Sequence, residues 1–407
     1  MVSQFQIEEV IAFQKKSLQR RVLGTEREDA HNYVLTENFA NIITGIRRCG
    51  KSTLMYQLIA QNKDVSLFIN FEDPRLAGFE LDDFRRLDAI IERDKCTHLF
   101  FDEIQMLSNW EWYVRQKLDE GFQVVVTGSN ANLLSKELGT KLTGRHLSSE
   151  LFPFSYTEFL TYSKLESNTE SALKYMQVGG FPEFLKTNNP LVLHQLWDDI
   201  LYRDIAVRYG VRDVQTLRKL AIYLLSNIGK TYSANKLSAL FQFKSVSTLL
   251  EYISHLENAY LVASVPMFSY SLKAQVRNPK KVYTIDLGLF TNLSIVFTEE
   301  NGRRLENLVF LHLRRSYTQI YYFQEKHECD FIVFDKEQVK ALYQVCFDFN
   351  FETQERELNG AYEAMKFFDL KKAVIVTVSQ SDVFTNEFGV VELMPLYRFL
   401  EKKARLL

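Results

Sequence analysis

The stretch that decides the fold is residues 39–61, which read FANIITGIRRCGKSTLMYQLIAQ. It joins an apolar run, a loop of the pattern GxxxxGKS from Gly45 to Ser52, and a segment with helical periodicity. Glycines let consecutive backbone N–H groups turn toward phosphate oxygens, and the start of the helix adds the positive end of its dipole. Because the loop lies between a strand and a helix, the pattern predicts a phosphate-binding loop.

The residues of this loop are expected to bind ATP. Lys51 can reach the β- and γ-phosphates, and the Ser52 hydroxyl can ligate Mg²⁺. ATP and Mg²⁺ are therefore the predicted cofactors. The predicted ATP-binding residues are Gly45, Ile46, Arg47, Arg48, Cys49, Gly50, Lys51, Ser52 and Thr53.

A second apolar run ends in two acidic residues, as HLFFDE with Asp102 and Glu103. Asp102 is predicted to hold Mg²⁺ through water, in the role that an acidic strand end has in such nucleotide sites. Glu103 is predicted to be the general base that accepts a proton from the attacking water. An acidic strand end is weak evidence alone, and it gains weight because the phosphate loop precedes it.

Polar residues follow the next apolar run and the loop after it. Asn130 is our candidate for sensing the γ-phosphate, with Ser129 as the alternative; an ordinary helix cap is the competing interpretation. Arg145, in the segment LTGR, is our candidate for an arginine that stabilises transition-state charge. Arg47 and Arg48 compete for that role, and a plain surface arginine is the structural alternative at Arg145.

The apolar runs also predict the domain organisation. Four of them, rich in Ile, Val and Phe and separated by helical segments, indicate a parallel sheet buried on both faces within residues 1–150. Residues 151–210 are predicted to be mainly helical and residues 211–295 to form three helices with a two-stranded wing, a winged helix. Residues 296–407 read helix, three strands, helix, strand.

Composition sets further limits on the protein class. A chain of 407 residues with 46% hydrophobic and 25% charged residues is typical of two or three globular domains. Its four cysteines lie far apart, without the spacing of a zinc site. We find no signal-peptide pattern and no apolar run long enough for a membrane span. The sequence therefore predicts a cytoplasmic protein without a membrane partner.

The middle of the chain is basic although the whole chain has a formal net charge of −2. Residues 211–290 contain ten Lys or Arg and four Asp or Glu, a net charge of +6. Such a module can bind double-stranded DNA through phosphate contacts, with the third helix reading a groove. Docking of a protein and service as an ATPase lid are equally open. The cations that we expect to contact phosphates are Lys244, Lys273, Arg277, Lys280 and Lys281.

Taken together, these motifs resemble a family of bacterial and archaeal AAA-type ATPases that carry a C-terminal domain of unknown function. The matching segments span nearly the whole chain: ITGIRRCGKSTLMYQL, FINFEDPRL, LFFDEIQMLSNWE, VVVTGSNANLLSKELGTKLTGR, LFPFSYTEFL, GGFPEFL and LENLVF, CDFIVF and ALYQVC.

The resemblance implies an α/β fold, a P-loop NTPase with the parallel sheet order 5-1-4-3-2, followed by a helical lid, a winged helix and a restriction-endonuclease-like C-terminal domain. It supports the roles of Gly45, Gly50, Lys51, Ser52, Asp102 and Glu103. In such ATPases an arginine finger acts on a neighbouring subunit, so the resemblance also implies a homo-oligomer.

The C-terminal segment departs from the nuclease pattern. Glu306 and Asp330 match, but the Glu-x-Lys that should follow reads Gln344-Val345-Cys346. A cysteine cannot replace a lysine that orients water or stabilises charge, so we predict a domain without nuclease activity. The sequence thus favours an ATPase that converts ATP to ADP and phosphate and moves its winged-helix and C-terminal modules. A nucleotide-gated DNA-binding regulatory or defence protein is the alternative, and an ATP-dependent nuclease is less favoured.

Overall fold

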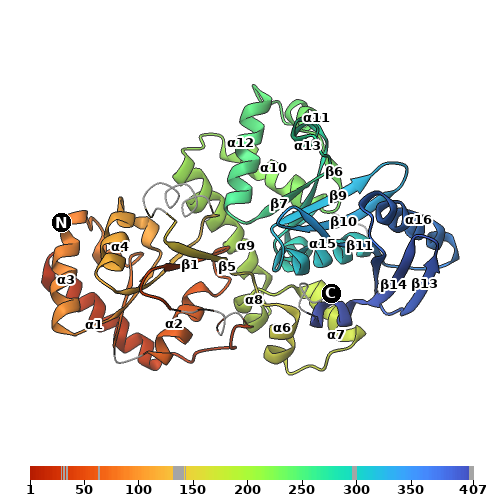
Figure 1. Ribbon diagram of the computed structural model, residues 1–407. Coiled ribbons are helices and arrows are strands. Elements are labelled where there is room, and N and C mark those ends of the chain that lie inside the picture. Colours follow the sequence, from red (N-terminus) through yellow and green to blue (C-terminus); the bar gives the residue numbers. More distant parts are fainter. Residues whose placement is uncertain are drawn as a thin grey trace. The chain divides into compact units, whose positions relative to one another are not determined.

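The computed structural model describes residues 1–28, 30, 33, 35–62, 65–131, 142, 144–295 and 300–402 (Figure 1). The chain forms two compact units, Met1–Phe152 and Pro153–Leu407. The domain boundaries at residues 150, 210 and 295 stay predictions.

The first unit contains a five-stranded parallel sheet in the order β2-β3-β4-β1-β5. This is the predicted order 5-1-4-3-2 read from the other edge, so the predicted α/β fold with a P-loop ATPase sheet is confirmed. The four apolar runs form β1 to β4. The strands are β1 Ala40–Thr44, β2 Ser66–Asn70, β3 His98–Asp102, β4 Gln123–Gly128 and β5 His146–Glu150.

Helices cover both faces of this sheet (Figure 1). Alternate strand residues, such as Ile42, Phe101 and Val126, share one hydrophobic core with residues of α1, α3 and α4. α2 follows β1 through the glycine loop and contacts β3 and β4. The helices are α1 Gln4–Arg20, α2 Lys51–Gln61, α3 Phe84–Arg93 and α4 Trp110–Asp119, with short 3₁₀ turns at Pro74–Leu76, Leu81–Asp83 and Ile104–Met106.

The second unit begins with helices, as predicted for residues 151–210. Ser155 caps the first of them. Its side chain accepts a hydrogen bond from the backbone N–H of Glu158, and the Glu158 carboxylate accepts one from the backbone N–H of Ser155. The helices are α6 Tyr156–Ser163, α7 Thr169–Val178, α8 Pro182–Thr187, α9 Pro190–Asp199 and a π-helical continuation of α9 at Ile200–Val207.

The basic segment forms helices and a small antiparallel sheet in the order β6-β8-β7. The sequence predicted three helices and two strands here; the two-residue strand β6 lies beyond what periodicity can show. α10 buries the predicted stripe that includes Leu217, Leu220 and Leu224. The elements are α10 Val214–Ser226, β6 Thr231–Tyr232, α11 Ala234–Leu240, α12 Val246–Asn258, β7 Val262–Pro266, α13 Leu272–Arg277, β8 Lys280–Thr284 and α14 Leu287–Leu293.

The C-terminal segment forms a six-stranded mixed sheet in the order β13-β14-β12-β11-β10-β9. The predicted order of helix, three strands, helix and strand is present, but it was incomplete, because β13, β14 and α17 follow. Residues Ala361, Ala364 and Met365 of α16 share a core with the sheet. The elements are α15 Asn301–Arg314, β9 Gln319–Gln324, β10 Glu328–Asp335, β11 Gln338–Cys346, α16 Phe351–Phe368, β12 Lys372–Thr377, β13 Asp382–Asn386, β14 Gly389–Pro395 and α17 Leu396–Glu401.

Helix length and hydropathy bear on the membrane prediction. Within the described ranges, every helix is too short or too polar to cross a lipid bilayer.

Candidate nucleotide site

The glycine loop between β1 and α2 has a backbone that only glycine suits at two points. Gly45 has φ +147°, and a Cβ there would lie 2.1 Å from the carbonyl oxygen of Leu151. Gly50 has φ +108° and is the N-cap of α2. A side chain at either position would require the loop to rearrange, so the sequence pattern fixes the shape of the loop.

Lys51 begins α2, and its side chain folds back into the loop. Its Nζ donates to the backbone oxygens of Gly45 and Ile46, both at 3.1 Å, and the residue is only 4% exposed. The ammonium group therefore lies inside the curve of the loop, among backbone groups. It is placed to neutralise an anion bound there.

Asp102 lies at the end of β3 and contacts two hydroxyl groups. Its Oδ1 accepts a hydrogen bond of 2.5 Å from Thr127 Oγ1, and the Ser52 hydroxyl is near enough to act on the pKa of its carboxyl group. Burial, followed by the neighbouring charge of Glu103, raises the pKa of Asp102 to about 6, while the two hydroxyl groups and Lys51 act in the opposite direction. The two residues predicted to hold Mg²⁺, Ser52 and Asp102, are thus side by side.

Glu103 follows β3 with a left-handed backbone, φ +53°. Its backbone N–H donates to Thr127 Oγ1 at 3.0 Å, and its carboxylate accepts a short hydrogen bond from Gln105 Nε2. A left-handed conformation of a residue other than glycine costs free energy, and such residues occur often at functional sites. Thr127 fixes this turn from the adjacent strand, although sequence analysis assigned it no role.

Ser129 and Asn130 follow β4, which lies between β3 and β1 in the sheet. Both are buried, at 2% and 0% exposure. The carboxyl ends of parallel strands meet at one edge of a sheet, so these residues share that edge with the loop and with Asp102. Ser129 Oγ is shielded from solvent and, among the described residues, has no hydrogen-bond partner.

Arg27 is a contact of the loop that sequence analysis missed. The residue is 1% exposed, and its Nη1 donates to the Cys49 oxygen at 2.8 Å while its Nη2 donates to the Phe152 oxygen at 2.7 Å. A Cβ at Gly50 would lie 2.9 Å from Nη1. No local motif marks this arginine, because it reaches the loop only through folding of the segment that precedes β1.

Arg145 lies at the other edge of the sheet. Its backbone oxygen accepts from Ala40 N at the start of β1, whereas the glycine loop follows the end of β1. Five strand residues separate these edges, which is roughly 16 Å. Its side chain donates to the Asn38 oxygen at 3.1 Å and pairs with Asp119. Arg145 is therefore too far from the loop of its own chain to contact a nucleotide there.

Arg47 and Arg48, the competing arginines, are part of the loop. Both Nη atoms of Arg47 lie 3.4 Å from Glu72 Oε1. Arg48 has φ +62°. Both residues thus lie at the site, and only Arg145 is remote from it.

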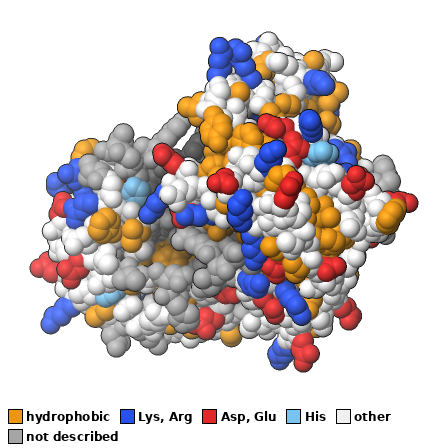
Figure 2. Space-filling model, turned by 45° about the vertical axis from the view of Figure 1, so that its right-hand side comes forward, with side chains coloured by type: hydrophobic (Ala, Val, Ile, Leu, Met, Phe, Trp, Pro, Cys, Tyr) orange, Lys and Arg blue, Asp and Glu red, His pale blue; other side chains and the backbone are white. Residues whose placement is uncertain are grey.

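The structure corrects one expectation for the basic segment. Lys281 is only 2% exposed, and its ammonium group contacts carboxylates rather than solvent. It cannot contact a phosphate. Figure 2 shows several Lys and Arg side chains on the upper lobe, among uncharged polar and hydrophobic ones. The other predicted phosphate contacts are exposed or half-exposed: Lys244, Lys273, Arg277 and Lys280.

The residues at the edge of the sheet fit ATP with Mg²⁺. Both glycines have the positive φ that lets a loop of this pattern turn consecutive backbone N–H groups toward phosphates. The orphaned Ser129 hydroxyl can bond to a bound group. Ser52 and Asp102 together offer the hydroxyl and carboxylate oxygens that Mg²⁺ prefers.

Comparison with protein families agrees with this geometry. Residues 37–160 match a family described as AAA domain, and residues 169–300 match a domain of unknown function, DUF8612. An uncharacterized protein of Methanocaldococcus jannaschii is 34% identical over 397 residues, covering 90% of this chain and 89% of that protein. An uncharacterized protein of Haemophilus influenzae is 30% identical over 342 residues, covering 79% and 85%.

Solved structures show weaker likenesses. AMPPCP-bound DnaA from Aquifex aeolicus is 14% identical with a TM-score of 0.27, covering 61% of this chain and 88% of that chain. The RuvB Holliday junction branch migration motor of Thermotoga maritima is 19% identical with a TM-score of 0.28, covering 62% and 88%. Likenesses at this level do not constrain the function.

Proposed function

The chain belongs to the same family as these uncharacterized proteins of M. jannaschii and H. influenzae and has an AAA domain, and from this membership we propose that it binds ATP with Mg²⁺ and hydrolyses it. The observation that carries the proposal is the glycine loop between β1 and α2, together with the packing of α2, which begins with Lys51 and Ser52, against β3, which ends with Asp102. The fold thus brings together two motifs that are fifty residues apart in the sequence.

Each of the site's residues has a part in the proposed reaction. Loop N–H groups and Lys51 bind the phosphates, and Lys51 exchanges its bonds to the Gly45 and Ile46 oxygens for phosphate oxygens. Glu103 accepts a proton from the water that attacks the terminal phosphorus. Asn130, with Ser129 as the alternative, orients that water or senses the terminal phosphate.

Ser52 and Asp102 would hold Mg²⁺, which when bound supplies positive charge beside the transferred phosphoryl group. Thr127 keeps Asp102 oriented through its hydrogen bond. The raised pKa of Asp102 reflects burial near Glu103, and a divalent cation would favour the ionised carboxylate.

Arg145 can take part only in the site of another copy of the chain, since it lies at the far edge of its own sheet. We therefore propose a homo-oligomer in which Arg145 contacts the terminal phosphate bound by a neighbour. Arginines in this position stabilise transition-state charge by factors of about 10³ to 10⁵.

Nucleotide state is proposed to change the position of the second unit. Support comes from the segment that leaves β5: Leu151 N donates to the Thr44 oxygen at 2.7 Å, and Arg27 joins the Phe152 oxygen to the loop. A shift of the loop would thus be felt at the residue before Pro153. The moving parts are a helical lid, a winged helix made by α10 to β8, and a restriction-endonuclease-like C-terminal domain.

The test of the proposal is phosphate release from ATP with Mg²⁺, measured together with ATP binding. We expect Lys51→Ala to lose ATP binding. Glu103→Gln should bind ATP and hydrolyse it about 10² to 10⁴ times more slowly, because the general base is lost. The exposed residues Lys15 and Glu92 provide matched controls, Lys15→Ala and Glu92→Gln. A wild-type protein that neither binds nor hydrolyses ATP would contradict the proposal.

A nucleotide-gated DNA-binding role is the weaker proposal. The exposed cations Lys273 and Arg277 support it. Against it, Lys281 is buried, and α12, the helix that would read a groove, has no Lys or Arg but carries Glu251 and Glu257. This role requires duplex binding that weakens with salt and with Lys273→Glu.

A further inference from the structure

Lys281 is a buried cation of the second unit that contacts several carboxylates. It lies on β8, and its side chain is 3% exposed. Its Nζ is 2.8 Å from Glu306 Oε1, 2.8 Å from Asp330 Oδ1 and 2.6 Å from Glu328 Oε1. Three carboxylates from α15 and β10 thus meet at one ammonium group.

The Lys281 ammonium group occupies the position of a cation among these three carboxylates. Burial alone would lower the pKa of Lys281, but Asp330 and Glu306 together raise it well above its usual range, so the amine is charged. Three carboxyl groups thus surround one ammonium group. No other basic side chain of the described residues forms an ion pair with Glu306, Glu328 or Asp330.

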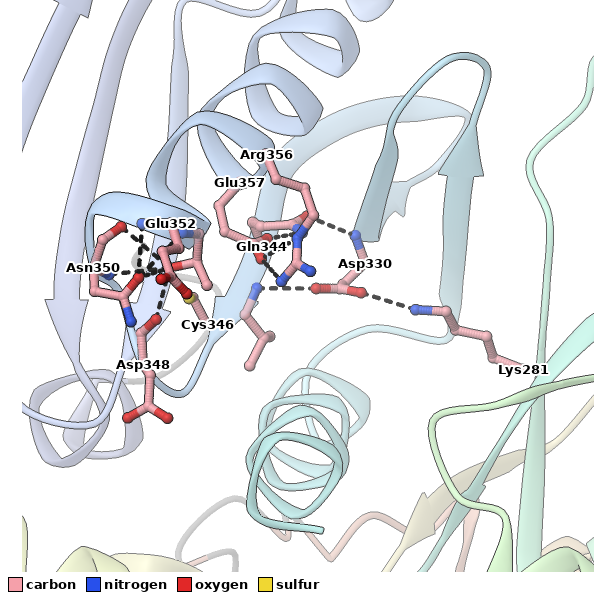
Figure 3. A network of polar contacts seen from close by, with 11 residues as sticks. Lys281, Asp330, Gln344, Cys346, Asp348, Asn350, Glu352, Arg356 and Glu357 are labelled. Atoms are coloured by element: carbon pink, nitrogen blue, oxygen red, sulfur yellow. Dashed lines mark hydrogen bonds and ion pairs between the residues drawn. The ribbon is translucent and has the colours of Figure 1, made fainter.

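The neighbouring polar residues support this arrangement and do not compete with it (Figure 3). Gln344 accepts from Asp330 N at 3.0 Å and donates to Glu357 at 2.5 Å, so its amide is already used. The second Asp330 oxygen accepts from Val345 N at 3.0 Å. The position of Asp330 is thus fixed from β11, with one oxygen left for the ammonium group.

β8 is held against α15 by more than this ion cluster. Tyr283 OH donates to Glu306 Oε1 at 2.6 Å, and Asn307 exchanges two hydrogen bonds with the backbone of Thr284, at 2.8 and 3.0 Å. The position of β8, the strand that carries Lys281, is therefore also fixed by contacts other than those of Lys281. Removing its charge should leave the strand in position.

We propose that Lys281 is the resident cation of the Glu306, Glu328 and Asp330 cluster and excludes a divalent metal ion from it. A side chain of β8 thereby occupies the place that a metal ion would take between the carboxylates of α15 and β10. Within the described residues, no group of three or more acidic, His or Cys side chains has the geometry to hold a metal.

The test is Mn²⁺ binding by the full chain without nucleotide, followed by electron paramagnetic resonance. We expect Lys281→Met to bind one Mn²⁺ more than the wild type and to lose it when Asp330→Asn is added. Lys280→Met, which removes the adjacent charge, should bind as the wild type does. The proposal is overturned if Asp330→Asn alone removes Mn²⁺ from the wild type, or if folded Lys281→Met gains none.

Thermal unfolding covers the case in which Lys281→Met does not fold well. Loss of the ammonium group leaves buried carboxylates without their cation, and replacing one of them should relieve the repulsion. We expect the melting temperature of the Lys281→Met, Glu306→Gln double variant to exceed that of Lys281→Met. A double variant that melts at the same or a lower temperature would show that Lys281 does not compensate this cluster.

Discussion

At the scale of single residues, Arg27 shows how much of the site depends on a side chain outside every motif. Its guanidinium donates to two buried backbone oxygens, of Cys49 in the loop and of Phe152 after β5. Leaving a buried acceptor unpaired costs about 1–3 kcal/mol. We therefore expect the arginine to affect nucleotide binding through the loop and to take no part in the chemistry itself.

Arg27→Met should weaken ATP binding about tenfold or more, an amount that corresponds to about 1.4 kcal/mol, while the rate at saturating ATP changes little. The loop would lose the donor to its Cys49 oxygen. ATP binding would then have to order the loop, and the free energy of that ordering would weaken the affinity. Arg27→Lys should recover part of the affinity. Titration of ATP and steady-state rates measure both effects.

Arg20→Met is the matched control, because Arg20 is exposed. Unchanged ATP affinity in Arg27→Met would rule out the positioning role of Arg27. A fall in rate at saturating ATP with unchanged affinity would assign Arg27 a part in the reaction itself.

At the scale of elements, the contact of α15 with α17 contains a histidine that should make the second unit sensitive to acid. His312 lies on α15 with its ring centroid 4.7 Å from that of Phe399 on α17. Burial, then the charge of Arg315, lowers the pKa of His312 to about 4. The folded protein therefore keeps this ring neutral at pH values where an unfolded chain protonates it.

Stability should fall as the pH drops from about 6.5, the usual pKa of histidine, to about 4, because only the unfolded state takes up the proton in that window. The loss is at most about 3.4 kcal/mol, from 1.36 kcal/mol per unit of pKa shift. His312→Leu should remove that part of the pH dependence. Thermal unfolding at several pH values between 7.5 and 4.5 measures it.

The exposed His194 supplies the control His194→Gln, which should follow the wild type. If His312→Leu and the wild type lose stability in parallel over this range, the acid sensitivity has another origin.

At the scale of the whole molecule, the position of Arg145 at the far edge of the sheet leads us to expect that hydrolysis requires an assembly. Arg145→Ala should bind ATP normally and hydrolyse it at least about 10³ times more slowly. Lys51→Ala should not bind ATP, but it keeps Arg145 and can supply that arginine to the site of a neighbouring chain. Mixing the two inactive chains should restore hydrolysis, since one supplies the loop and the other the arginine.

Phosphate release from the mixture, compared with each variant alone, is the measurement. Arg20→Ala, a surface arginine variant, should leave the rate unchanged. Normal hydrolysis by Arg145→Ala would exclude the finger role, and a mixture as inactive as its components would exclude action between chains.

The sequence by itself determined the glycine loop, the strands of the first unit and the residues Lys51, Ser52, Asp102 and Glu103, because their spacing and apolar context are local properties of the chain. It also predicted the sheet order through a resemblance. The sequence did not predict the short strand β6 or the strands β13 and β14, since strands of this kind form only when a partner strand is present.

Tertiary structure alone decided which distant side chains meet. It brought Arg27 and Thr127 to the candidate nucleotide site, placed Arg145 at the opposite edge, and buried Lys281 among carboxylates. The physical reason is that a charged side chain reads the same in a sequence whether it faces solvent or an ion pair. Only the packing of strands and helices fixes its neighbours, and these neighbours decide its chemistry.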